Sequence, residues 1–184
     1  MYNTITYKKI IIIACIVSIL LGVLLHFAYD ISSKNFIIGL FTPVNESIWE
    51  HLKLSVIPFT IFCIGFYFYT KKKFSNMLLV SFFGNLCSMF ITVVLYYIGL
   101  KIFKTDNMIF NILVYVLSVI TAYLVLYLGI YNECFFSETK DSSILGTCAL
   151  VLLISTFIIN TVSPIRLDIT KDPIDKTYGI HKLV

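Results

Sequence analysis

The 184-residue chain is 59% hydrophobic and only 13% charged, with a formal net charge of +4. Soluble domains carry about 25% charged residues, so the composition excludes an ordinary soluble domain and predicts a protein embedded in the lipid bilayer. The positive residues flank apolar runs and form no single basic face, so we expect no nucleic-acid partner. No feature of the sequence identifies a protein partner.

Five long runs without a charged residue follow one another along the chain. They contain 20, 17, 27, 26 and 24 residues, and a membrane-spanning helix needs about 20. The runs predict an all-α integral membrane protein in which five transmembrane helices form a bundle, as a single domain over residues 1–184. The first run is longer than a signal-peptide core of about 7 to 15 residues, so we interpret it as a span rather than a cleaved leader. The expected spans are residues 10–29, 43–70, 76–99, 110–131 and 145–162, followed by a tail at 163–184.

The second span is expected to begin at Thr42-Pro43, after a loop at residues 30–41. Thr42 has a side chain suited to a helix N-cap, and Pro43 suits the first helical position. The same helix would continue through the charged motif at residues 45–53 and end at Thr70. Asn45, near the expected helix start, is interpreted as a further capping residue.

The distribution of lysines predicts how the chain crosses the cell membrane. Lys8 and Lys9 precede the first span, and residues 71–73 form a triple-lysine loop after the second span. Short loops rich in lysine and arginine stay on the cytoplasmic side, so we expect the N-terminus inside and the C-terminus outside. The tail adds positive residues to the outer face, and we give them less weight than the first helix and the triple lysine.

An odd number of spans places three distant segments on the same side of the membrane. These segments are the end of the first span, the start of the second span and the tail. Ionisable groups are costly within a span and usually face a partner or a water-filled cavity. The residues expected to meet at this side are His26, Asp30, Glu46, Glu50, His51, Asp172, Tyr178 and His181.

Two pairs of these side chains are spaced by four residues, which on a helix places both members on one face. The pairs are His26 with Asp30 and Glu46 with Glu50. Imidazole and carboxylate ligands together suit zinc, manganese or iron. The sequence therefore predicts a site for a divalent transition metal built from these four residues.

Glu50 and His51 are the candidate catalytic residues of this site, with Glu50 as a possible general base for a metal-activated water. His51 lies about 100° around the helix from Glu50, so its membership in the same cluster does not follow from spacing alone. A structural alternative also fits the sequence. Lys53 on the same stripe and the positive helix N-terminus would offset the repulsion between Glu46 and Glu50.

The tail ends with the elements Asp172-Pro173 and Tyr178-Gly179-Ile180-His181. Chain termini are often mobile unless they are tied down. The apolar and aromatic residues near the end of this tail favour a segment that folds back over the site as a lid. Asp172 and Tyr178 are therefore candidate contributors to the polar cluster.

Three blocks of sequence resemble one uncharacterised family of small multi-pass bacterial membrane proteins. They are residues 26–30 (His-Phe-Ala-Tyr-Asp), residues 41–53 with the Asn-Glu-Ser-x-Trp-Glu-His motif, and the tail with Asp172-Pro173 and residues 178–180. The resemblance extends over essentially the whole chain. It implies the multi-pass fold but no reaction, cofactor or ligand set.

Three functions are compatible with these features. The first is a membrane protein whose polar cluster binds a cation or a lipid headgroup. The second is a metal-dependent membrane hydrolase, and the third is a small transporter or accessory subunit in which the cluster is structural. The sequence does not decide whether the protein is an enzyme.

Overall fold

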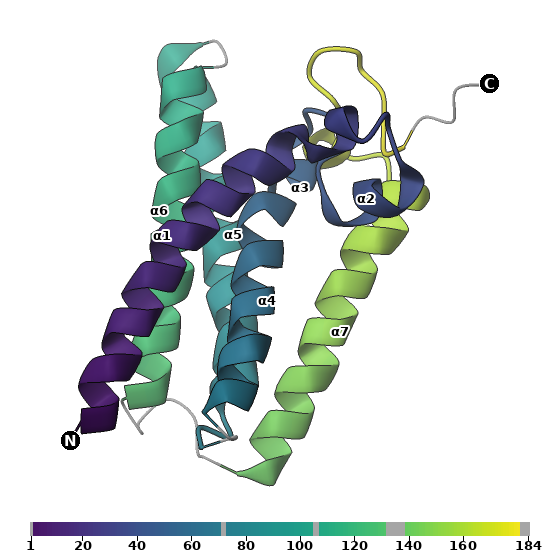
Figure 1. Cartoon of the computed structure of the whole chain (residues 1–184). Coiled ribbons are helices and arrows are strands. Elements are labelled where there is room, and N and C mark those ends of the chain that lie inside the picture. Colours follow the sequence, from purple (N-terminus) through teal and green to yellow (C-terminus); the bar gives the residue numbers. More distant parts are fainter. Residues whose placement is uncertain (1, 71–72, 105–106, 132–138, 181–184) are drawn as a thin grey trace.

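The computed structural model describes residues 2–70, 73–104, 107–131 and 139–180, with side chains from residue 5 onwards. Within these ranges the chain forms helices and no β-strand (Figure 1). The helices are α1 (Tyr2–Ile31), α2 (Phe36–Phe41), α3 (Ile48–His51), α4 (Lys53–Tyr69), α5 (Met77–Phe103), α6 (Met108–Tyr131), α7 (Lys140–Val162) and the 3-10 helix η1 (Asp168–Thr170).

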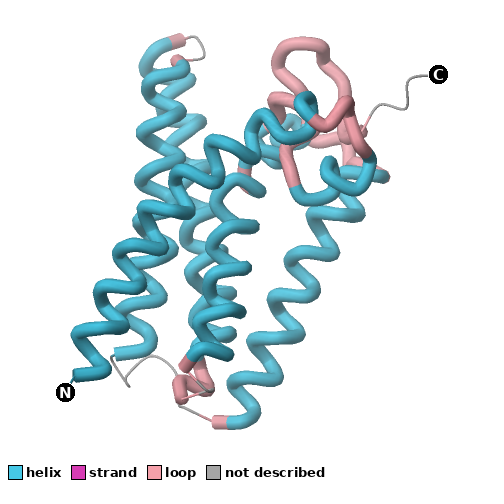
Figure 2. Tube along the Cα trace, in the orientation of Figure 1, coloured by secondary structure: helices cyan, strands magenta, loops and turns pink. Residues whose placement is uncertain are grey.

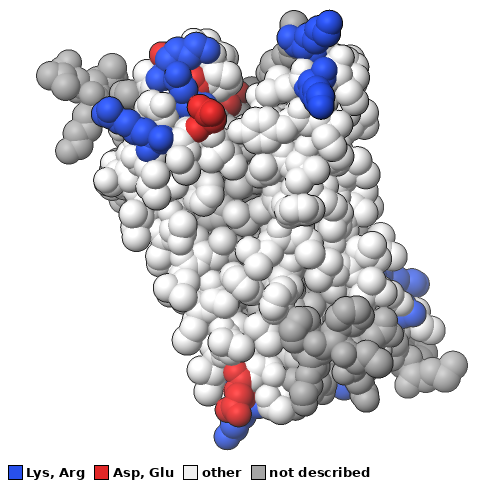
Figure 3. Space-filling model, turned by 180° about the vertical axis from the view of Figure 1, so that it is seen from behind, with Lys and Arg blue, Asp and Glu red and all other residues white. Residues whose placement is uncertain are grey.

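Five stretches are long and apolar enough to cross a membrane. They are α1, the pair α3–α4, α5, α6 and α7, with 22 to 27 residues each. The all-α fold with five membrane-spanning helices, expected from the uncharged runs, is therefore confirmed. Figure 3 shows the consequence on one face of the molecule, where charged side chains gather at the two ends and leave a wide uncharged band between them.

Helix α4 lies at the centre of the bundle. About two-thirds (67%) of the most apolar stretch of the α3–α4 span is buried within the protein, against 22–39% for the other four spans. Helix α4 packs against α1, α5 and α6, while α7 packs along α5 (Figure 1). The core between these helices is built from large apolar side chains that include Phe59, Cys63 and Phe66 of α4, Met77 and Val80 of α5, and Val119, Tyr123 and Leu126 of α6.

The end of the bundle opposite the N-terminus carries a cap of short helices and loops, made of residues 32–52 and 163–180 (Figure 2). It contains α2, α3, η1 and most of the loop structure drawn in Figure 2. The cap joins the end of α1, the beginning of α4 and the end of α7. The three segments expected on one membrane side therefore lie together.

The second span differs from the expected helix at residues 43–70. Residues 42–47 are not helical, and α3 begins only at Ile48. The Thr42 hydroxyl donates to the Ile38 carbonyl at the end of α2 and does not cap a following helix. Ser47 is the N-cap instead, because its Oγ accepts the backbone N–H of Glu50 at 3.3 Å.

The expected loop at residues 30–41 also contains structure of its own. Its second half forms α2, which is started by the Asn35 side chain accepting the N–H groups of Ile37 and Ile38. Helix α7 begins at Lys140, five residues before the expected start of the last span. Lys71, Lys72 and His181, which entered the sequence-based predictions, lie outside the described residues.

Candidate metal centre

A buried ion pair occupies the middle of the cap. The Lys53 ammonium lies 2.6 Å from Glu50 Oε2, and the two side chains are 0% and 2% exposed. Removing two charges from water is costly, and the cost is offset only if the remaining hydrogen-bonding capacity of both groups is used. The pair therefore depends on its surroundings.

The surrounding polar groups come from α2, from the loop at residues 42–47 and from the end of α7. Lys53 Nζ donates to the carbonyls of Gly39 and Thr42 at 3.1 Å each and lies 2.7 Å from Thr161 Oγ1 of α7. Glu50 accepts the Thr161 hydroxyl at 2.9 Å and the Val44 N–H at 3.2 Å. The ion pair thus holds α2, the 42–47 loop and α7 to the start of α4.

Hydrogen bonds connect the tail to the loop at residues 42–47. Asp172 Oδ2 accepts the backbone N–H of Glu46 at 2.8 Å, and the Asn45 amide donates to the Gly179 carbonyl at 3.3 Å. The Ile180 N–H donates to the Thr161 carbonyl at 2.9 Å. Asn45, which was interpreted as a cap, does not cap α3 but binds the tail, and Asp172 binds the loop from the other side.

Gly179→Ala is expected to loosen the tail. Gly179 has φ +57°, a backbone conformation that disfavours side chains, and an added Cβ would lie 2.5 Å from the Thr161 carbonyl oxygen. We expect the docking of the tail onto α7 to become less favourable by about 1–3 kcal/mol. The measurement is faster hydrogen exchange of the Ile180 amide. Gly65→Ala is the matched control, since a Cβ there meets nothing. Equal protection of Ile180 in both variants would contradict the assigned tail contact.

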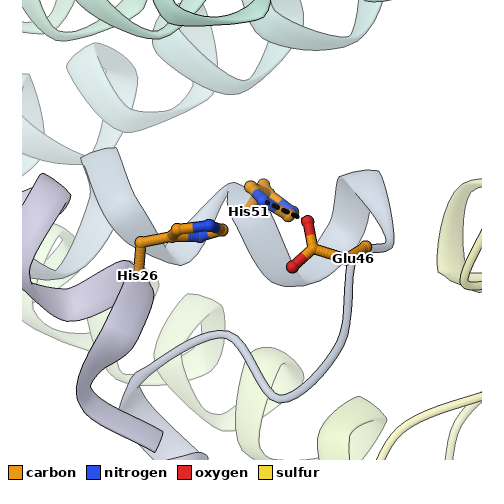
Figure 4. A group of neighbouring side chains, drawn as sticks. All are labelled: His26, Glu46 and His51. Atoms are coloured by element: carbon orange, nitrogen blue, oxygen red, sulfur yellow. Dashed lines mark ion pairs between the residues drawn. The ribbon is translucent and has the colours of Figure 1, made fainter. Parts of the chain in front are cut away.

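Next to this cluster, three side chains with metal-ligating atoms converge. His26 from α1, Glu46 from the loop and His51 from α3 each offer one ligand atom, and all three atoms lie within 4.8 Å of one another. Figure 4 shows the two imidazoles and the carboxylate turned toward one another, with His51 between the other two. Among the described residues, no other group of three or more His, Cys, Asp or Glu side chains converges as closely.

The His51 ring is held in a defined orientation. Its Nδ1 lies 2.9 Å from the carbonyl oxygen of Ser47, which can only accept, so Nδ1 carries the proton. In the neutral ring, Nε2 then presents a lone pair toward Glu46 Oε2. A hydrogen bond from the far ring nitrogen to a backbone carbonyl is the usual support of a metal-ligating histidine.

The separation between His51 Nε2 and Glu46 Oε2 is 3.4 Å. Charge-assisted N–H···O bonds are about 2.7–2.9 Å long, so this distance is long for a direct ion pair. Two ligand atoms, each about 2.1 Å from a tetrahedral zinc ion, lie about 3.4 Å apart. The distance is therefore compatible with a loose ion pair and with two ligands of one ion.

His26 completes the group from the opposite side. Its ring centroid lies 5.1 Å from that of His51, and the two planes are inclined at 45°. Its Nδ1 atom is buried and has no hydrogen-bond partner among the described residues. Buried polar atoms are nearly always paired, so this nitrogen has the capacity to bind a water molecule or an ion.

A pocket of about 730 Å³, open mouth included, begins at this centre. Glu46 and His51 line it together with residues of α4, α5 and α6 and with Pro173 and Ile174 of the tail. The tail therefore contributes two residues to the pocket wall. Two of the three converging side chains, Glu46 and His51, border this space.

The structure groups the predicted site residues differently from the sequence-based hypothesis. His26 and Glu46 come together as expected, but the third member is His51, which was proposed as a catalytic residue. Asp30 is exposed near the end of α1 and is not in the group. Glu50 is bound to Lys53, and its two carboxylate oxygens accept hydrogen bonds within the cap.

Tyr178 lies in the tail, half-buried, where its backbone pairs with Lys171 in an isolated β-bridge. Ser47 was not singled out in the sequence, although it caps α3 and its carbonyl orients His51. The spacing Ser47-x-x-Glu50 is a capping-box pattern and could have revealed the true helix start.

Taken together, the fold defines an all-α protein with five helices long and apolar enough to span a membrane. The model of the Family of unknown function (DUF6512) matches residues 1–180. The chain therefore belongs to this family, in agreement with the expected membership in an uncharacterised family. No curated protein matches the chain, and no solved structure matches it.

Proposed function

We propose that this protein is a membrane metalloprotein that binds one divalent transition metal ion, best matched by zinc, through His26, Glu46 and His51. The observation that carries the proposal is the convergence of three ligand atoms from three separate segments within 4.8 Å. Two imidazoles and one carboxylate form a ligand set suited to zinc.

The ligand number supports a reactive rather than a structural site. Structural zinc sites are usually closed by four protein ligands, whereas catalytic sites combine three protein ligands with an open position. A bound zinc ion would supply a Lewis acid and an activated water molecule. Hydrolysis is therefore the reaction class that we propose, with the substrate held in the pocket beside Glu46 and His51.

Glu50 has a supporting role in this proposal and is not the general base. Its carboxylate already accepts from Lys53, Thr161 and Val44, and it is buried away from the pocket. A base must reach the proton that it abstracts, directly or through one water molecule. Glu50 instead fixes the start of α4 and, through it, the position of His51.

We also propose that the N-terminus lies inside the cell, which places the cap on the outer side of the cell membrane. Lys8 and Lys9 before the first span support it. The test is labelling of single cysteines, introduced in a cysteine-free variant, by a membrane-impermeant maleimide on intact cells. Labelling of Lys176→Cys without labelling of Ser143→Cys is expected, and the reverse pattern would overturn the orientation.

Zinc titration of the purified protein tests the metal assignment. We expect one zinc ion per chain at pH 7.5, with binding weakened strongly at pH 5. The direction follows because an imidazole must lose its proton to bind a metal, and its ordinary pKa is about 6.5. Substoichiometric zinc at pH 7.5, with manganese and iron also unbound, would refute the proposal and leave a His51–Glu46 ion pair.

A further inference from the structure

We infer that the pocket beside the metal centre binds a single-chain amphiphile. Its metal-coordinating head group would lie at Glu46 and His51, and its apolar chain would extend between α4, α5 and α6. The inference names a ligand class for the same site and rests on the proposed function.

The pocket has a charged end and an uncharged remainder. Glu46 and His51 are the ionisable acid and imidazole of its wall, and both belong to the metal centre. Deeper in, the wall includes the apolar side chains Leu54 and Val114 and the ring of Tyr115. A ligand that matches this wall has one polar end and one apolar end.

Four hydroxyl groups of the pocket wall already donate hydrogen bonds within the protein. Ser55, Thr92 and Ser118 each donate to a backbone carbonyl three or four residues earlier in the chain, at 3.1, 2.9 and 2.7 Å. The Tyr115 hydroxyl lies 2.9 Å from the Ile19 carbonyl of α1. With these protons committed, the space suits a hydrocarbon chain better than a sugar or a peptide, whose polar groups would lose hydrogen bonds to water.

The position of the pocket within the bundle also favours an amphiphile. Val114 and Ser118 of α6 line it, while Leu113 and Leu117, on the same turns of α6, are exposed on the outer surface of the bundle. Exposed leucines on a membrane-spanning helix face lipid chains. The pocket therefore lies beside the hydrocarbon region.

Binding of two hydroxamates to the zinc-loaded protein in lipid nanodiscs tests this inference. Acetohydroxamate and octanohydroxamate have the same metal-coordinating head and differ by six methylene groups. We expect octanohydroxamate to bind at least about 10-fold more tightly, because each methylene buried in an apolar pocket adds affinity. Titration calorimetry, corrected with empty nanodiscs, measures both constants.

Thr92→Phe and Val94→Phe provide a matched pair of variants. Thr92 lines the pocket, whereas Val94, on the same helix, is exposed on the outer surface. The phenylalanine in Thr92→Phe should fill the pocket and reduce the ratio of the octanohydroxamate affinity to the acetohydroxamate affinity to about 1. The zinc stoichiometry should remain unchanged. Val94→Phe should keep the wild-type ratio. If Thr92→Phe does not fold, Ser118→Leu narrows the pocket from α6.

The possible results separate the two proposals. One zinc ion per chain with no chain-length preference, or an equal loss of preference in both phenylalanine variants, would overturn the amphiphile and leave the metal site intact. Failure to bind zinc would overturn the proposed function itself, and the amphiphile inference with it. A preference that is lost only in the pocket variant supports both.

Discussion

Replacement of Lys53 by methionine is expected to destabilise the folded protein by about 3–5 kcal/mol, since the Glu50 carboxylate would remain buried without its cation. The variant would also lose the hydrogen bonds from the ammonium to Gly39 and Thr42. The measurement is denaturant- or heat-induced unfolding of the purified protein in detergent. The effect should extend through the cap, because the ion pair joins α2 and α7 to α4.

Two further variants make this prediction specific. Lys101→Met removes an exposed lysine near the end of α5 and should change stability by less than about 0.5 kcal/mol. The double variant Glu50→Gln with Lys53→Met removes both charges and should recover part of the loss. A Lys53→Met variant no less stable than Lys101→Met would show that the ion pair does not hold the cap together.

His51→Ala is expected to weaken zinc binding by at least about 100-fold, because it removes the central ligand of the proposed centre. His26→Ala and Glu46→Ala should have effects in the same direction, since each removes one of only three protein ligands. Zinc affinity is measured by competition with a chromogenic chelator. His51 is only partly buried, so the alanine variant should still fold.

Asp30→Asn and Glu50→Gln are the controls for this series. Both residues were predicted as ligands from their spacing, and both lie outside the converging group. Asp30→Asn should bind zinc as the wild type does. Glu50→Gln should lower stability while its folded fraction keeps one zinc ion per chain. If either variant loses zinc more completely than His51→Ala, the ligand assignment is wrong.

The sequence predicted the five spans because the physics that sets them is simple. A charged side chain in the hydrocarbon region is costly, so the charged residues of this chain mark the ends of its helices. The helix boundaries that were predicted wrongly lie in the cap. There, hydrogen bonds to water and to distant parts of the chain compete with helix formation. Thr42-Pro43 resembles a helix start, but the Thr42 hydroxyl bonds Ile38 and the next helix is capped by Ser47.

The candidate site was predicted only in part, for a related reason. The four-residue spacing places Glu46 and Glu50 on one face only if both are helical, and Glu46 precedes the N-cap of α3. The two carboxylates therefore separate, and Lys53 binds Glu50 alone. The orientation of the His51 ring depends on the Ser47 carbonyl, a contact that a sequence pattern does not specify.

X-ray absorption at the zinc edge, on protein loaded with one equivalent of zinc, examines the metal directly. Two imidazole nitrogens near 2.0–2.1 Å, one carboxylate oxygen and one exchangeable oxygen ligand are the expected environment, with one imidazole lost in His51→Ala. A spectrum with oxygen ligands alone, unchanged in that variant, would mean that zinc associates elsewhere. The two histidines would then be neighbours in an ordinary membrane bundle.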